Sequence, residues 1–103
     1  ELEGEIIYID SFGNLITNIS RTVFERFAHR FQQCRLSARI RRSVSLPLHR
    51  AYAEAPPGAP LAIFGSFDLL EVAVRNGNAA AHFHATVGTR VSIRTAAARN
   101  ISR

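Results

Sequence analysis

The sequence contains no methionine, no tryptophan and no lysine, and it has a single cysteine. Cys34 alone cannot form an internal disulfide, so the fold does not depend on an oxidising compartment, and we expect a cytoplasmic protein with a partly buried thiol. No apolar run approaches the ~20 residues of a membrane-spanning helix, and the start does not resemble a secretory signal. We therefore expect no membrane association. Because the first residue is Glu1 and methionine is missing, we expect an excised domain or a processed fragment of a longer protein.

The 103 residues have room for one domain and one core. Apolar residues make up 47% and charged residues 20%, which is typical of a globular protein and argues against disorder. The net charge is +5, and all 13 basic residues are arginine. Such a balance raises nucleic-acid binding as one hypothesis. A codon bias toward arginine explains the same composition.

Short apolar or alternating segments, separated by Gly, Asn and Pro turn signals, predict a mainly β protein. Only the segment after Ser20, which can cap a helix, has clear helical spacing, and its apolar stripe (Val23, Phe24, Phe27, Ala28 and Phe31) is interpreted as core. After the turn at residues 65–68, Leu70, Val72 and Val74 alternate with Glu71, Ala73 and Arg75, which predicts the returning strand. The predicted strands cover residues 3–10, 15–19, 36–40, 44–48, 61–64, 70–74 and 91–93.

These elements predict an antiparallel β-barrel or sandwich-like domain with one short helix around residues 21–33. A single helical turn is possible over residues 79–83. Residues 1–94 form the predicted domain, and residues 95–103 are expected to be a frayed tail. Two of the four histidines, His82 and His84, lie close together but lack a third ligand. We therefore predict no metal site.

Two segments carry polar residues in turns instead of on strand faces: residues 10–14, and residues 65–68 with 76–80 one strand later. Glycine beside an aromatic and an amide lets the backbone approach a flat ligand while the ring stacks on it. Asparagine offers a donor and an acceptor, which suits a purine edge, and aspartate can pair with an ammonium group. Composition alone favours ordinary hairpin turns.

Taken together, the segments IDSFGNLITNI, PPGAPLAIFGSFDLLEVAV and NGNAA resemble the C-terminal domain of the S-adenosylmethionine hydroxide adenosyltransferases, relatives of the bacterial fluorinase and chlorinase. The resemblance extends from about Gly4 to Ile93. It implies a larger N-terminal α/β domain, absent from this chain, and a homotrimer in which substrate lies between that domain of one subunit and the C-terminal domain of its neighbour. The resemblance further implies a reaction in which a water or hydroxide attacks the ribose 5′ carbon and expels methionine, leaving adenosine.

The resemblance also implies roles for single residues in adenine binding. Phe12 would pack on the adenine, and Asn14 would read its edge. The backbone of Asn78 and Ala79 would complete the recognition. Tyr52 matches an aromatic position of the family and would close the adenine slot.

For the methionine part, the resemblance implies that Asp10 holds the ammonium group and Ser66 the carboxylate. Phe67 stands where the fluorinase has an arginine, which favours the hydrolase branch, and Asp68 replaces a common glycine. The family's water-activating residues belong to the N-terminal domain, so no catalytic residue is expected here. By the same resemblance S-adenosylmethionine is the expected substrate, and no cofactor is expected.

Two other hypotheses remain open. A basic β-barrel that binds nucleic acid, without enzymatic activity, rests on Arg35, Arg39, Arg41 and Arg42. Single-stranded nucleic acid needs exposed aromatic platforms, whereas the phenylalanines fall in the helix or in turns, so a solvated strand face is the better interpretation. An oligomerisation module would expose an apolar patch near Phe12 and Phe67 and would self-associate.

Overall fold

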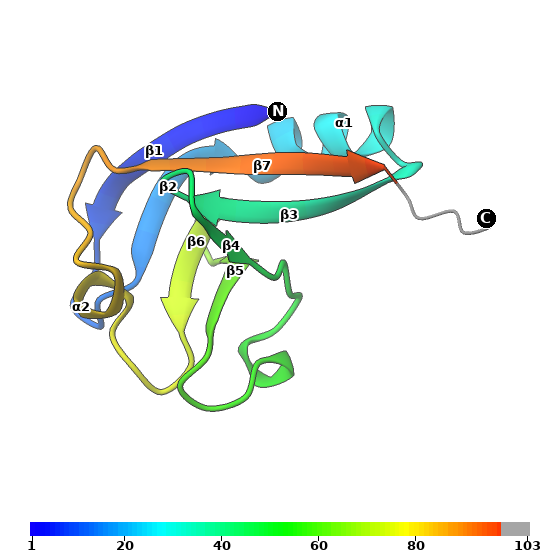
Figure 1. Cartoon of the computed structure of the whole chain (residues 1–103). Coiled ribbons are helices and arrows are strands. Elements are labelled where there is room, and N and C mark those ends of the chain that lie inside the picture. Colours follow the sequence, from blue (N-terminus) through cyan, green and yellow to red (C-terminus); the bar gives the residue numbers. More distant parts are fainter. Residues whose placement is uncertain (98–103) are drawn as a thin grey trace.

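The alternating segments of the sequence fold into one antiparallel sheet in the computed structural model, which describes residues 1–97 (Figure 1). Between the strands lie two α-helices, α1 (Arg21–Arg30) and α2 (Ala79–Phe83), and a 3₁₀ turn, η1 (Tyr52–Glu54). Neither helix of this described part is long and apolar enough to cross a membrane. The strands are β1 (Leu2–Ile9), β2 (Leu15–Ser20), β3 (Cys34–Ile40), β4 (Val44–Leu46), β5 (Pro60–Phe64), β6 (Leu69–Val74) and β7 (Arg90–Ala97).

The strand order is β4-β3-β7-β1-β2-β6-β5, and every pair of neighbours is antiparallel. The two edges approach each other after β4, where Leu48 forms a parallel bridge to Ala62. Two backbone hydrogen bonds support this contact, from His49 N to Ala62 O and from Ala62 N to Pro47 O, both of 2.9 Å. The sheet is therefore a nearly closed barrel, which confirms the predicted fold class.

The barrel interior is filled by aliphatic side chains from alternate strand positions, as the period of two requires. The largest of them are fully buried: Ile6, Leu15, Ile40, Leu46, Leu70, Val72, Val91 and Ile93. Ala79 and Phe83 of α2 join this cluster, and Phe24 and Phe27 of α1 pack against it. Both helices are thus attached to the same core.

Helix α1 begins where the sequence predicts, because the Ser20 hydroxyl accepts a hydrogen bond of 3.1 Å from the Val23 backbone N–H. It ends at Arg30, earlier than predicted, and residues 31–33 form a turn. No residue of α1 is fully buried, and Val23 is 43% exposed. The prediction of a core stripe holds for Phe24 and Phe27 but was wrong for Val23.

Strand β7 extends to Ala97, beyond the predicted strand end at residue 93 and the domain boundary at residue 94. Its last residues pair with the start of β3, where Leu36 faces Thr95 and Cys34 faces Ala97. A tail beginning at residue 95 was therefore wrong for residues 95–97. Residues 98–103 lie outside the described residues, so the frayed tail stays a prediction there.

Strand β6 differs from its predicted pattern because it is buried on both faces. Glu71 and Ala73, which alternate with Leu70, Val72 and Val74, are themselves only 6% and 1% exposed. Ala73 packs with Leu61 and Ile63 of β5, and Ala55 and Ala59 of the β4–β5 connection cover them. This connection is a second layer over the outer face of β5 and β6. Periodicity within one strand does not reveal such a layer.

Candidate functional site

The turn after β1 is organised by the side chain of Asp10. Its Oδ1 accepts hydrogen bonds of 2.9 Å from the backbone N–H groups of Phe12 and Asn14, and its Oδ2 accepts one of 3.1 Å from Asn14 Nδ2. These bonds pair the backbone N–H groups of the turn with the Asp10 side chain. Phe12 is left 75% exposed. The result is a rigid loop that presents an aromatic ring to its surroundings.

Gly13 joins this turn to the start of α2. Its φ of +85° lies in the left-handed region, and an ideal Cβ would lie 2.1 Å from Asn78 Oδ1. Gly13 O also accepts a hydrogen bond of 2.9 Å from Ala80 N. Asn78 Oδ1 caps the helix by accepting one of 2.9 Å from Ala81 N. The predicted residues Asn78 and Ala79 are therefore fixed directly beside the turn of residues 10–14.

An open pocket of about 480 Å³ lies next to these two segments. It contains three of the residues predicted to bind adenine, namely Phe12, Asn14 and Tyr52. Asn78 and Ala79 adjoin the pocket but do not line it. Asp10 does not line it either, but its carboxylate binds Asn14, which does. The lining residues are Phe12, Asn14, Tyr52, Val74, Arg75, Asn76 and Gly77.

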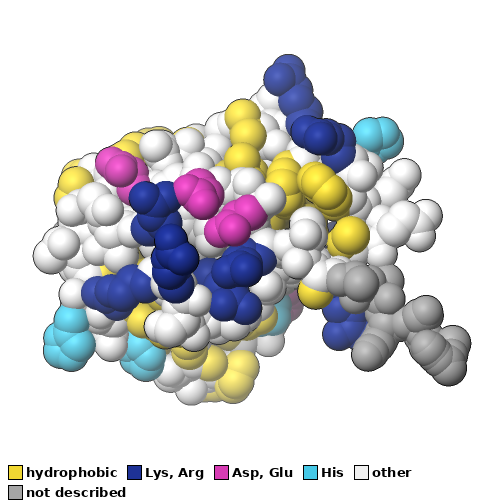
Figure 2. All heavy atoms as spheres, turned by 45° about the horizontal axis from the view of Figure 1, so that its top comes forward, with side chains coloured by type: hydrophobic (Ala, Val, Ile, Leu, Met, Phe, Trp, Pro, Cys, Tyr) yellow, Lys and Arg dark blue, Asp and Glu magenta, His cyan; other side chains and the backbone are white. Residues whose placement is uncertain are grey.

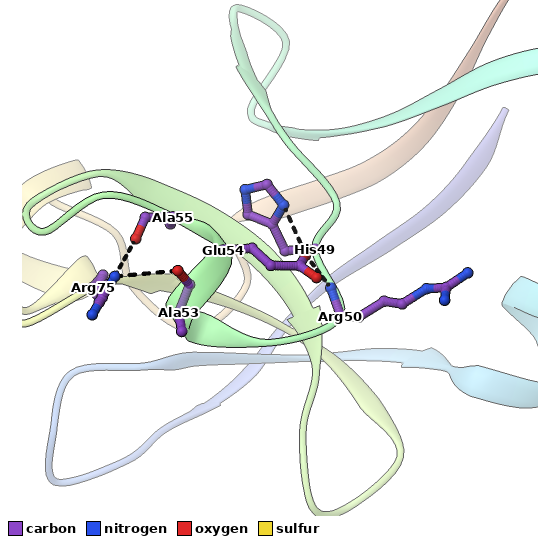
Figure 3. Close-up of polar contacts among 6 residues, drawn as sticks. All are labelled: His49, Arg50, Ala53, Glu54, Ala55 and Arg75. Atoms are coloured by element: carbon purple, nitrogen blue, oxygen red, sulfur yellow. Dashed lines mark hydrogen bonds and ion pairs between the residues drawn. The ribbon is translucent and has the colours of Figure 1, made fainter.

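Tyr52 lines this pocket and belongs to the β4–β5 connection. Arg75, directly after β6, binds this connection next to Tyr52 (Figure 3). Arg75 Nη1 donates to Ala55 O at 2.7 Å and to Ala53 O at 3.3 Å. Glu54 Oε1 accepts from Arg50 N at 2.9 Å and lies 3.3 Å from His49 Nδ1. Residues on both sides of Tyr52 are thus held in place.

Sequence reasoning missed Glu71, a buried acid behind Tyr52. The Tyr52 hydroxyl donates to Glu71 Oε1 at 3.3 Å. Burial and then the neighbouring Asp10 raise the pKa of Glu71, although the bond from Tyr52 opposes the shift. Burial and then Glu71 raise the pKa of Tyr52. The sequence signal for Glu71 is that it is the one acid in an otherwise apolar strand, LLEVAV. A single acid in a strand is equally typical of a position that faces solvent.

Ser66 lies apart from the pocket, in the exposed turn between β5 and β6, where Asp68 N donates to Gly65 O at 3.0 Å. Glu71 lies between the two regions, because its Oε2 is 1.7 Å from an ideal Cβ on Gly65. Asp68 has a φ of +58°, a conformation that glycine adopts more readily. Its carboxylate pairs with Arg21 Nε at 2.9 Å, so an arginine compensates the acid beside Ser66.

Residues 4–92 match the family model of the SAM hydroxide adenosyltransferase C-terminal domain. The chain belongs to this family. It is also 40% identical over 77 residues to the (R)-S-adenosyl-L-methionine hydrolase of Thermus thermophilus, a match that covers 75% of this chain and 26% of that protein.

Two crystal structures have the fold of this SAM hydroxide adenosyltransferase C-terminal domain over 89% of the chain. An uncharacterized conserved protein from Thermotoga maritima superposes with a TM-score of 0.73 at 27% identity, over 35% of its own length. A conserved hypothetical protein from Thermus thermophilus gives 0.69 at 30% identity, over 34% of its length. The chain thus spans about a quarter to a third of the proteins it matches.

Of the four arginines on which the nucleic-acid hypothesis rests, Arg39 and Arg41 make internal contacts in this SAM hydroxide adenosyltransferase C-terminal domain, whereas Arg35 and Arg42 are exposed. Arg41 donates to Phe83 O at 2.9 Å and to His84 O at 3.0 Å, so it caps the C-terminus of α2. Arg39 Nη1 donates to Arg42 O at 2.9 Å. On the face in Figure 2, several arginine side chains gather together, with acidic side chains beside them. Within residues 1–97 no three His, Cys, Asp or Glu side chains group as metal ligands.

Proposed function

We propose that this domain is the substrate-binding half of an S-adenosylmethionine hydrolase, which converts S-adenosylmethionine and water to adenosine and L-methionine. The observation that carries the proposal is the pocket shared by Phe12, Asn14 and Tyr52, fixed beside Asn78 and Ala79 by the Gly13 contact. The name of the Thermus relative supports the same reaction.

The adenine part is bound by surfaces that match its chemistry. The exposed Phe12 ring offers an apolar face for stacking. Asn14 Nδ2 is bound to Asp10, which orients the amide so that its oxygen is an acceptor for the exocyclic amino group of adenine. The half-exposed ring of Tyr52 closes the opposite side of the slot.

The methionine part carries a cationic ammonium and an anionic carboxylate. Asp10 accepts three hydrogen bonds within its turn, and because a carboxylate has about four acceptor positions, one remains for the ammonium group. The exposed Ser66 hydroxyl binds the carboxylate. Phe67 offers no charge to that carboxylate, which agrees with the hydrolase branch and with water as the nucleophile.

The catalytic step takes place in a trimer, between this domain and the N-terminal α/β domain of a neighbouring subunit. Phe12 and Phe67 are 75% and 70% exposed, and the neighbour would cover them. Closure positions water in line with the 5′ carbon and excludes bulk solvent. The neighbouring domain supplies the residues that activate water, so this domain alone is inactive. Its cytoplasmic location stays a prediction.

Hydrolysis by the full-length protein that carries this domain tests the proposal. We expect adenosine and methionine to form in equal amounts from S-adenosylmethionine. Asn14→Ala should raise KM about tenfold, because loss of a hydrogen bond in a binding site costs about 1–2 kcal/mol. Gln32→Ala, an exposed amide in the turn after α1, is the matched control and should leave KM unchanged. Absence of both products, or equal KM values for Asn14→Ala and the control, would refute the proposal.

A further inference from the structure

Glu71 has no role in the reaction as described so far. It faces Ile16 of β2 on one side and Ile63 of β5 on the other, and only 6% of it is exposed. Among residues 1–97 its carboxylate forms no ion pair. A buried carboxylate without a cation destabilises a fold, and an apolar residue would suit this position better. Stability therefore does not explain the acid.

The two oxygens of Glu71 reach two different parts of the candidate site. Oε1 accepts the hydrogen bond from the Tyr52 hydroxyl, and the Tyr52 ring lines the pocket. Oε2 occupies the space beside Gly65 in which a side chain would otherwise lie. Gly65 directly precedes Ser66. One carboxylate thus contacts both the wall that faces adenine and the turn that faces the methionine carboxylate.

Tyr52 depends on this contact for its orientation. It belongs to a 3₁₀ turn whose start has no side-chain cap, and 41% of the residue is exposed. Arg75 binds backbone oxygens of this turn, whereas the hydrogen bond of the Tyr52 side chain goes to Glu71. Because a tyrosine ring turns about two side-chain bonds, anchoring its hydroxyl fixes the plane of the ring.

On the basis of the function proposed above, we infer that Glu71 is a positioning residue, whose carboxylate holds Tyr52 against adenine and supports the turn that presents Ser66. Its charge contributes as well. Burial and the proximity of Asp10 raise the pKa of Glu71, so a ligand that brings a cation relieves the repulsion between the two carboxylates. S-adenosylmethionine carries two cationic centres, the ammonium and the sulfonium groups.

The test uses Glu71→Met, Tyr52→Phe and the double variant in the full-length protein. Methionine is unbranched and of similar volume, and it suits a position between two isoleucines. KM and kcat for S-adenosylmethionine and the midpoint of thermal unfolding are measured for each variant. We expect each single variant to raise KM about three- to tenfold, because a hydrogen bond to a carboxylate is charge-assisted. The kcat should change less than KM.

The double variant should be no worse than the poorer single variant, because both substitutions remove the same hydrogen bond. Glu71→Met should also keep or raise the thermal midpoint, since it removes a buried charge. A lower midpoint with unchanged KM would make Glu71 a structural residue and overturn the inference. Effects that multiply in the double variant would overturn it as well.

The two proposals fail in different ways. If the wild-type protein neither binds nor hydrolyses S-adenosylmethionine, the proposed function fails, and this inference fails with it. If the wild-type protein is active and both single variants keep its KM, only the positioning role is refuted. Should Glu71→Met not fold, Tyr52→Phe decides alone, because it removes only the hydroxyl group that binds Glu71 and leaves the barrel core unchanged.

Discussion

Strands β3 and β6 belong to the same barrel, but they are buried in different ways. In β3, Ala38 and Ile40 face the core while Arg35 is exposed. In β6, every residue from Leu70 to Val74 is buried, because the β4–β5 connection covers its outer face. The two strands have similar length and are both antiparallel to their neighbours. The barrel wall is therefore one layer thick at β3 and two layers thick at β6.

Most residues of the candidate site lie next to β6, where the barrel wall has two layers. The turn of residues 65–68 precedes β6, and residues 75–78 follow it. Tyr52 comes from the covering layer itself. The turns around β3 hold none of the predicted site residues. The connection that covers β6 restrains the turns at both ends of this strand, and fixed turns suit ligand contacts. Within the described residues strand β3 has no such cover, and its arginine-bearing face is solvated.

The largest effect is expected from Gly13→Ala, on the two-layered side. The substitution places a side chain in the left-handed region and into the Asn78 amide, 2.1 Å from its oxygen. Strain and overpacking each cost about 1–3 kcal/mol, so we expect a loss of about 3 kcal/mol in the free energy of unfolding. Denaturant unfolding measures this loss.

Gly88→Ala, before β7, is the matched control. Its φ is +96°, but no described atom lies within 4 Å of an ideal Cβ. Only the backbone strain remains, and we expect a loss of about 1 kcal/mol. Equal losses for the two variants would mean that the contact between Gly13 and Asn78 contributes nothing to the rigidity of the site.

An intermediate effect is expected from Arg75→Leu, which removes the hydrogen bonds to Ala53 O and Ala55 O. Loss of these bonds should lower the free energy of unfolding by about 1–2 kcal/mol and raise KM for S-adenosylmethionine, because Tyr52 moves with the connection. Arg35→Leu on the exposed face of β3 should stay within about 0.5 kcal/mol of the wild type. If the two variants behave alike, the second layer does not depend on Arg75.

The smallest effect concerns pH. Because the pKa of Glu71 is raised in the folded state, the folded protein binds this proton more tightly than the unfolded chain does. The free energy of unfolding should therefore gain a contribution as the pH falls toward the ordinary glutamate pKa, and lose it as the pH rises through the raised pKa. Glu71→Met should flatten this part of the stability profile, measured by denaturant unfolding at a series of pH values. An unchanged slope would contradict the raised pKa.

The sequence was sufficient for the features that depend on neighbouring residues. Ser20 and Val23 lie three positions apart, so the helix cap is visible in the sequence, and the strand alternation predicts the barrel. The glycine and asparagine turns were found for the same reason. The resemblance to the family then selected Phe12, Asn14 and Tyr52, which the structure places in one pocket.

Features that depend on distant residues could not be predicted in this way. Glu71 alternates correctly for a solvated position, and only the connection that covers Ile63 and Ala73 makes it a buried acid. Strand β7 extends to Ala97 because β3 offers partners for its last residues, although an Ala-rich segment has little β propensity of its own. Arg41 caps a helix more than forty residues away. Long-range packing decided each case.

The pairing of β1 with β7 also affects how the chain folds as it is made. Leu2 faces Ile93 and Glu5 faces Arg90, and β1 lies between β2 and β7 in the sheet. During synthesis β1 emerges from the ribosome long before β7. The edge of β1 that later pairs with β7 is therefore unpaired after the hairpin of β1 and β2 has formed. The barrel closes only after Arg90 and the residues that follow have been synthesised. A contact between such distant segments is slow to form, so the edge of β1 stays open to pairing with other chains until β7 covers it.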